Sequence, residues 1–291
     1  MELSMSLDYL LKKRGTTEKR DFAEAVKLCR DAGFTYVDYS PDFKSENWAE
    51  KAKRDKEILD AAGLIVEQTH APFNRYGQHP EELFGTYYKN LFEASKIVGA
   101  KYVVVHADEY RTVDHYDEKE AEDFAYEYLS PYVEYAKKNG MTVAIENVFE
   151  DSIRRCPQFD GKSRYTSRIH ELKAIIERFN DPAVQCCWDF GHANCAFGKD
   201  NMLDALKEVG KYLCCTHVHD NYYEKDLHLA PFLGEIRWEE HMAYLKEIGY
   251  AGKFSFEMVY GRQPEALLGG WLKELHKTGE YLVGLYDAAE K

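Results

Sequence analysis

The feature that most constrains the fold is a regular alternation of short apolar runs with longer stretches of helical periodicity. Each run is rich in Val, Tyr, Phe or Cys, and each following stretch repeats apolar residues every three to four positions. We expect strands at Leu3–Leu7, Phe34–Tyr39, Leu64–Gln68, Tyr102–Val105, Thr142–Ile145, Val184–Trp188, Tyr212–Val218 and Lys253–Phe256. We expect helices at Thr17–Asp31, Glu46–Ala62, Pro80–Val98, Glu118–Lys138, Ser167–Phe179, Met202–Val209, Trp238–Ile248 and Pro264–Asp287.

Eight such units in 291 residues average about 36 residues each, the size of a βα unit in a closed barrel. We therefore predict an α/β fold, a (β/α)8 TIM barrel that forms a single domain over residues 1–291, with the active site at the C-terminal ends of the strands. An open doubly wound sheet would alternate in the same way, but no Gly-rich phosphate loop follows an early strand. Glycines that suit a left-handed helix end follow four expected helices: Gly33, Gly63, Gly140 and Gly249.

Composition excludes several classes of function. The 38 basic and 51 acidic residues give a net charge of −13, which argues against binding to nucleic acid or to an anionic membrane. No apolar run approaches the roughly 20 residues of a membrane span, and the first residues do not resemble a signal peptide. The seven cysteines include no CxxC pair, so we interpret them as small buried apolar residues of a cytoplasmic protein.

Seven consecutive expected strands end in a carboxylate or an imidazole. A lone residue of this kind at a strand end is more often a turn former, but the repetition of the pattern is informative. Because the carboxyl ends of parallel barrel strands converge on one mouth, these side chains should meet there. They are Asp38, His70, His106, Glu146, Asp189, His219 and Glu257.

Three carboxylates buried at one mouth would cost several kcal/mol per ion unless a cation neutralised them. We therefore predict one divalent metal ion held by Glu146, Asp189, His219 and Glu257, from four neighbouring strands. His217 lies two residues before His219 and points the same way, and only one of the two need face the ligand. Three oxygen donors and one nitrogen donor suit Mn²⁺, Mg²⁺, Fe²⁺, Co²⁺ or Zn²⁺.

Three further histidines are candidates for substrate contacts at the same mouth. His192 lies three residues after Asp189 and could hydrogen-bond a substrate hydroxyl. His70 and His106 follow the third and fourth strands, where they could contact substrate or ligate further metal ions.

These residues and their motifs resemble the xylose isomerase-like barrel superfamily, in particular its ketose 3-epimerases and inosose dehydratases. The motifs are VAIENV, WDFGHAN, HVHDN and FSFEMV, together with DLHLAPFLGEIRW before the seventh helix. The resemblance covers nearly the whole chain. It implies a sugar or sugar phosphate substrate, one metal ion, most often Mn²⁺, and Glu146 and Glu257 as the acid/base pair. The pair would move a proton beside a carbonyl through a metal-stabilised enediolate.

The chain departs from the epimerase pattern at two places. Ser152 stands where those enzymes carry another glutamate, and the segment after His219 lacks their substrate-binding arginine. A lyase or dehydratase acting on a cyclitol or glycoside would use similar chemistry, and a non-catalytic metal-bearing barrel is a third alternative.

More distantly, the chain resembles the zinc phosphodiesterase endonuclease IV. Asp226 and His228 would then join the other strand-end residues in a second metal site or a three-zinc cluster. The net charge argues against this nuclease reading.

The segment Phe149–Arg168 is the longest irregular stretch at the expected mouth. Its five basic residues could receive a phosphate or carboxylate of the substrate, or could serve only solubility. They are Arg154, Arg155, Lys162, Arg164 and Arg168. Three aromatic residues near strand ends could form an apolar floor against a sugar face: Phe73, Trp188 and Trp238. A homo-oligomer is expected by analogy alone.

Overall fold

The structure is a computed structural model, which describes residues 1–13, 18–73, 82–109, 116–150, 164–223, 225–259 and 264–289. Eight parallel strands form one sheet. Their bounds are β1 Glu2–Ser6, β2 Tyr36–Asp38, β3 Ile65–His70, β4 Tyr102–Val105, β5 Thr142–Glu146, β6 Val184–Asp189, β7 Leu213–His217 and β10 Lys253–Phe256. All eight overlap the strands expected from the sequence.

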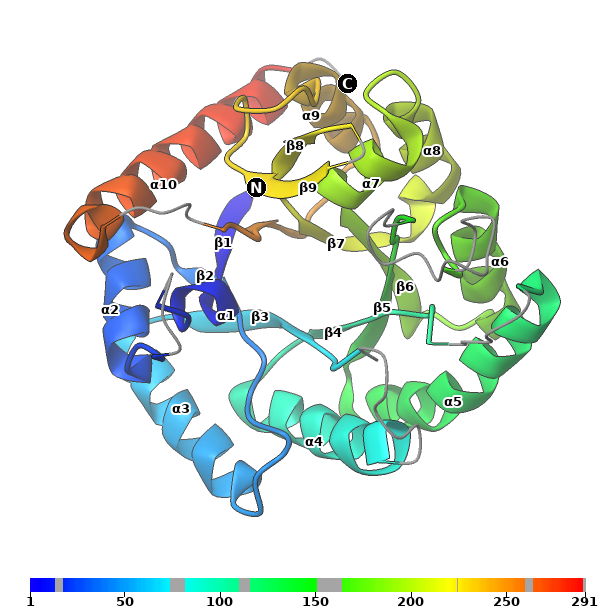
Figure 1. The fold of residues 1–291 in the computed structure, drawn as a ribbon, viewed down its shortest axis with the longest axis horizontal. Coiled ribbons are helices and arrows are strands. Elements are labelled where there is room, and N and C mark those ends of the chain that lie inside the picture. Colours follow the sequence, from blue (N-terminus) through cyan, green and yellow to red (C-terminus); the bar gives the residue numbers. More distant parts are fainter. Residues whose placement is uncertain are drawn as a thin grey trace.

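The sheet curls into a nearly closed barrel. Its strand order is β10-β1-β2-β3-β4-β5-β6-β7, so each strand pairs with the next along the chain and β10 returns to β1. The last gap is bridged just beyond β7, where Val218 N donates to Ser255 O at 2.7 Å and Glu257 N donates to Val218 O at 3.1 Å. Viewed along the barrel, the strands form a ring that the helices surround (Figure 1). The TIM barrel predicted from the alternation is thereby confirmed.

In the described part of the chain, one α-helix follows each barrel strand except β1 and β6, which are each followed by two. The expected helices correspond to α2 Phe22–Ala32, α3 Trp48–Ala62, α4 Tyr88–Val98, α5 Glu118–Asn139, α6 Ile169–Phe179, α8 Met202–Val209, α9 Trp238–Glu247 and α10 Glu265–Ala288. Local signals fix their ends. The Asp21 carboxylate accepts from the Ala23 and Glu24 amides at the start of α2, and Gly63 ends α3 with φ +70°.

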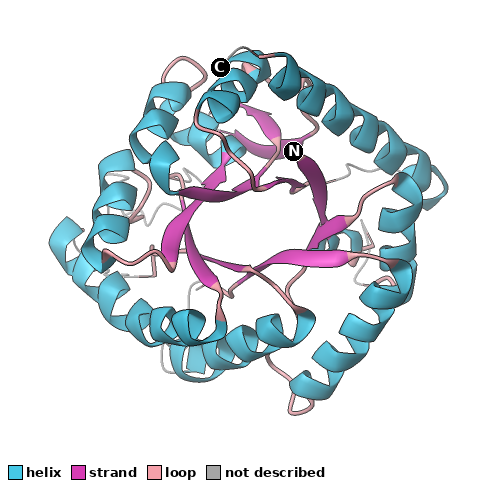
Figure 2. Ribbon diagram, turned by 180° about the vertical axis from the view of Figure 1, so that it is seen from behind, coloured by secondary structure: helices cyan, strands magenta, loops and turns pink. Residues whose placement is uncertain are grey.

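The apolar side chains pack in two regions. The main core combines buried side chains of the strands with those of the helices, which surround the strands (Figure 2). A small second cluster comprises Tyr102, Val104, Ala144, Cys187, Cys214 and Cys215. On β4, Tyr102 and Val104 belong to this cluster while Val103 and Val105 join the main core, as the two-residue period of a strand requires.

The described cysteines behave as buried apolar residues. All six, Cys29, Cys186, Cys187, Cys195, Cys214 and Cys215, are buried and outside any disulfide, as the sequence predicted. Cys156 lies outside the described residues. Among the described helices, none is both long enough and apolar enough to cross a membrane.

Three elements were not expected from the sequence. They are the short helix α1 Leu7–Leu10, the helix α7 Phe190–Phe197, and a hairpin of β8 Asp220–Tyr222 with β9 Lys225–Leu229. Within the stretch expected as the helix Pro80–Val98, a six-residue π-helix at Glu82–Tyr87 leads into α4. The hairpin packs against α7 and lies across one side of the barrel opening (Figure 1). Its polar sequence resembles a loop, and tertiary contacts order it.

Asp220 anchors this hairpin and the segment that follows it. Its buried carboxylate accepts from the amides of Asn221, Phe232 and Ile236 at 2.9–3.2 Å. It also accepts from the indole Nε1 of Trp238 at 2.9 Å. Four donors on one carboxylate fix the path of the chain from β8 to α9.

Candidate active site

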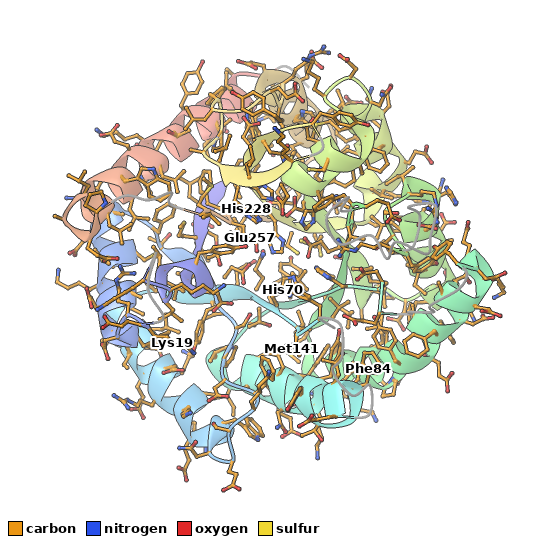
Figure 3. The ribbon with its side chains drawn as sticks, viewed as in Figure 1. Lys19, His70, Phe84, Met141, His228 and Glu257 are labelled. Carbon is orange, nitrogen blue, oxygen red and sulfur yellow. The ribbon has the colours of Figure 1, made fainter. Side chains whose placement is uncertain are left out.

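A cavity of about 770 Å³ opens at the carboxyl ends of the barrel strands. Its polar lining includes Asp38, His70, His106, Glu146, His192 and Glu257, which come from strand ends around the barrel. His70, His228 and Glu257 gather over the barrel opening (Figure 3). The cavity therefore lies where the strand-end pattern predicted the active site, and it contains most of the residues in that pattern.

Glu146, the last residue of β5, contacts four histidines of the site. Its side chain is 1% exposed, and its Oε2 lies 3.0 Å from His70 Nε2 and 3.1 Å from His106 Nε2. Its Oε1 lies 3.1 Å from both His217 Nδ1 and His192 Nδ1. Burial by itself would raise the pKa of Glu146, but the imidazoles, His217 and His106 foremost, hold that pKa well below its usual range. Glu146 is thus an anion surrounded by four histidines.

Asp189 ends β6 and caps the unexpected helix α7. Its Oδ1 accepts from the His192 amide at 2.6 Å, which fixes the carboxylate at the helix N-terminus. The two carboxylate oxygens lie 3.1 and 3.2 Å from His219 Nε2. Although burial raises its pKa, the charges of His192 and His219 outweigh that effect and lower the pKa of Asp189. The carboxylate is therefore held ionised and in one orientation.

His217, rather than His219, lies closest to all three carboxylates of the predicted metal set. Its Nδ1 is 3.1 Å from Glu146 Oε1, 3.7 Å from Asp189 Oδ2 and 3.8 Å from Glu257 Oε2. The ring is fully buried. Of those three carboxylates His219 contacts Asp189, on the side towards the hairpin. The sequence prediction chose His219 of the two histidines, whereas in the structure His217 lies nearer to the three carboxylates.

The hairpin brings Asp226 and His228 to the rim of the site. Asp226 Oδ2 lies 3.3 Å from His228 Nε2, and Asp226 Oδ1 lies 3.8 Å from His219 Nδ1. The His228 ring stacks on His219 with centroids 3.9 Å apart. His228 Nδ1 donates to the backbone oxygen of Glu257 at 2.8 Å. Burial by itself would lower the pKa of His228, but the Asp226 carboxylate outweighs burial and raises that pKa to about 9.

The three histidines expected to contact substrate all line the cavity. Burial lowers the pKa of His192, but Asp189 and Glu146 outweigh that effect and raise it to about 10. Burial dominates for His106 and lowers its pKa. The structure thus places both a cationic and a neutral imidazole at the same wall, which can donate to different oxygens of a polyhydroxylated ligand.

The donor set fits a divalent cation. Among the described residues, ligand atoms converge in several groups, including Asp189 with His217 and Glu257, and His219 with Asp226 and His228. The buried Nδ1 of His219 has no hydrogen-bond partner in the described part of the chain. Buried carboxylates facing imidazole nitrogens are the donors that Mn²⁺, Fe²⁺, Co²⁺ and Zn²⁺ take, so the residues present fit the group that the sequence predicted.

The predicted aromatic floor is only partly present. Phe73 lines the cavity and stacks on His106 at 4.7 Å. The prediction is wrong for Trp188 and Trp238, which are fully buried in the main core between sheet and helices. Trp188 precedes Asp189 by one residue, so it points to the opposite face of β6.

Of the two described basic residues expected to receive an anion, Arg164 lines the cavity. Arg164 Nε donates to Asp108 at 2.5 Å and its Nη1 donates to Phe149 O at 2.9 Å. Arg168 instead pairs with Glu171 and does not line the cavity. Arg154, Arg155 and Lys162 lie outside the described residues, as does Ser152.

Comparison with known proteins gives a consistent result. A family model described as "Xylose isomerase-like TIM barrel" matches residues 26–275. The uncharacterized protein y4fM of Sinorhizobium fredii is 24% identical over 276 residues, covering 84% of this chain and 85% of that protein. A D-tagatose 3-epimerase-like protein superimposes with a TM-score of 0.70 at 22% identity, covering 99% of this chain and 98% of the other. D-psicose 3-epimerase from Clostridium cellulolyticum H10 superimposes with a TM-score of 0.73 at 15% identity, covering 97% of this chain and 99% of the other. At these identities the two structures establish a shared fold.

Proposed function

Because the chain belongs to the xylose isomerase-like TIM barrel family, we propose that it is a divalent-metal-dependent isomerase or epimerase of a sugar or sugar phosphate. The observation that carries the proposal is the arrangement of Glu146, Asp189 and Glu257 around His217. Glu146 and Glu257 line the cavity. Its volume of about 770 Å³ lies within the range of pockets that enclose small ligands.

We propose Glu146, Asp189 and Glu257 as metal ligands, together with an imidazole. The sequence assigned that imidazole to His219, and the distances favour His217. When bound, the cation supplies Lewis-acid stabilisation, worth several kcal/mol, for negative charge that develops on the sugar carbonyl oxygen. Mn²⁺ is the first candidate, because a carboxylate-rich set with one imidazole suits it.

Glu146 and Glu257 are the proposed acid/base pair. The side chain of Glu257 is 17% exposed and reaches the cavity, so it can take a proton from a carbon next to the substrate carbonyl. Glu146 is 1% exposed and its imidazole neighbours keep it ionised, so it can accept a proton from a precisely held position. Bases on opposite faces of the substrate would give epimerisation, and one base serving two adjacent carbons would give isomerisation.

The remaining cavity groups would bind the sugar. We propose that His70, His106 and His192 donate to its hydroxyl oxygens, because all three line the cavity beside Glu146. Phe73 and Phe149 present apolar rings at the same wall, against which a sugar face can pack.

The test measures exchange of substrate hydrogen with solvent deuterium on a panel of ketoses and their phosphates, with the metal content of the same preparation determined. We expect deuterium to appear next to the carbonyl. Glu146→Gln and Glu257→Gln should each lower the exchange rate at least about 100-fold, since each removes a proton-transferring group. Cys187→Ala, in the small inner apolar cluster, is the matched control and should exchange normally. Metal-loaded protein that exchanges no deuterium with any of these sugars would refute the proposal.

One observation favours a second candidate, metal-dependent phosphodiester hydrolysis. The hairpin sets Asp226 and His228 beside His219, while His70 and His106 both face Glu146. The site therefore offers ligands for more than one cation, as in endonuclease IV, which the sequence resembles. Three zinc ions per chain and hydrolysis of bis-p-nitrophenyl phosphate would favour this function, and a single Mn²⁺ or Mg²⁺ would favour the sugar chemistry. The products of the same deuterium assay would reveal a lyase or dehydratase. Such an enzyme would give a product smaller than the substrate by one water molecule or by the leaving group.

A further inference from the structure

Asp38 is the last residue of β2 and lies near the three carboxylates of the proposed metal site, Glu146, Asp189 and Glu257, without being one of the proposed ligands. Its Oδ2 lies 3.2 Å from His217 Nε2, on the opposite side of the ring from the carboxylates. Among the described residues, Asp38 is in none of the groups whose ligand atoms converge closely enough for one cation. Its contact with the proposed metal site is through His217.

The position of Asp38 is fixed by its neighbours in the sheet. Asp38 pairs with Gln68 in the register of β2 and β3, so the two side chains point into the barrel together. Gln68 Nε2 donates to Asp38 Oδ2 at 3.0 Å and lies 3.4 Å from Thr216 O, which precedes His217. Gln68 is fully buried and Asp38 is 3% exposed, so little of either side chain is open to water.

The contacts of His217 dictate which of its nitrogens keeps a proton. A neutral imidazole has one N–H, and acceptors flank both ring nitrogens. Nδ1 faces the carboxylates of Glu146, Asp189 and Glu257, whereas Nε2 faces the carboxylate of Asp38 at 3.2 Å. With a cation among the three carboxylates, Nδ1 would supply its lone pair and the proton would stay on Nε2, whose N–H would donate a hydrogen bond to Asp38 Oδ2.

We infer that Asp38 is a positioning residue that holds His217 in the Nε2–H form, so that the Nδ1 lone pair faces the metal. The inference rests on the proposed metal site and assigns the ligand atom within it. A carboxylate that accepts from the distal nitrogen of a metal-bound imidazole fixes its tautomer and ring orientation and strengthens it as a ligand. The neighbouring ring of His70 lies nearly parallel to that of His217, with the ring centroids 5.6 Å apart.

The first test measures the affinity of the metal-free full chain for Mn²⁺ and Cd²⁺ by calorimetry. Asp38→Ala should weaken binding about 10- to 100-fold, the usual effect of losing such a partner. Asp38→Asn should recover most of the loss, because the amide oxygen still accepts from Nε2–H. Asp55→Asn is the matched control: it removes a carboxylate that accepts from Tyr39, adjacent to Asp38, away from the site, and should bind metal as the wild type does.

The second test reads the ligand atom directly. In the ¹⁵N spectrum of protein loaded with ¹¹³Cd, we expect coupling to Nδ1 of His217 and a proton on its Nε2. Coupling to Nε2, or to His219 in place of His217, would overturn the inference while leaving the metal-dependent function intact. Unchanged affinity in Asp38→Ala would overturn it as well. A wild-type chain that binds neither metal would overturn both the inference and the proposed function.

Discussion

Asp8 offers a test of the electrostatics of the cavity that needs neither metal nor substrate. It lies in the first turn of α1 at the cavity wall, where its two oxygens are 3.2 and 3.4 Å from the Ser40 amide. Burial, followed by the charge of Asp38, raises the pKa of Asp8 from 3.8 to about 7. The folded protein therefore holds a proton that the unfolded chain releases near pH 4.

The sign of the effect on stability follows from that difference. Between pH 4 and 7 the folded state binds more protons than the unfolded state, so this group makes the protein less stable as the pH rises. A shift of about 3 pKa units at 1.36 kcal/mol each sets an upper bound of about 4 kcal/mol. Because the side chain meets solvent in the cavity, we expect about half of that bound.

Asp8→Asn replaces the protonated carboxyl with a neutral group of the same shape. We expect the variant to be more stable than the wild type by about 2 kcal/mol at pH 8 and by less than about 1 kcal/mol at pH 5, because only the interval from pH 3.8 to 5 has contributed there. The assay is urea unfolding of chelator-treated protein at both pH values. Asp204→Asn, on the exposed surface of α8, is the control and should change stability by less than about 0.5 kcal/mol at either pH. If Asp8→Asn follows the pH dependence of the wild type, the assigned pKa of Asp8 is refuted.

Two further predictions concern the packing that supports the site. A Cβ on Gly191 would lie 1.8 Å from His219 Cε1, so Gly191→Ala should lower the free energy of unfolding by about 3 kcal/mol. Gly284→Ala, with nothing within 4 Å of the new Cβ in α10, should stabilise by up to about 1 kcal/mol, and equal effects of the two changes would contradict the reasoning. Trp238→Phe removes the indole donor to buried Asp220 and should cost about 1–3 kcal/mol in urea unfolding. An unchanged transition would show that Asp220 does not need that donor.

Much of the barrel and its mouth could be predicted from the sequence, because the signals are local. The two periodicities, of strands and of helices, mark the elements, and parallel order then follows from their alternation. Asp38, His70, Glu146 and Asp189 are indeed the last residues of their strands, and Glu257 directly follows β10. Since parallel strands end at one side of a barrel, their convergence needed no knowledge of side-chain packing.

Only the tertiary structure decided which of these side chains meet. His217 and His219 share one face of an extended segment, yet His217 reaches Glu146 and Asp38 while His219 reaches Asp189 and the hairpin. That outcome depends on how β7 joins β10 through Val218 and on the register shift between β6 and β7.

The β8–β9 hairpin likewise could not be predicted from the local sequence. Its polar sequence gives no strand pattern, and Asp220 orders it through donors as distant in sequence as Trp238. Local sequence therefore determined the elements and the residue types at the mouth. Barrel closure and contacts between residues far apart in sequence decided which nitrogen faces which carboxylate, because a turn of one ring or a shift of one residue along a strand changes the partner.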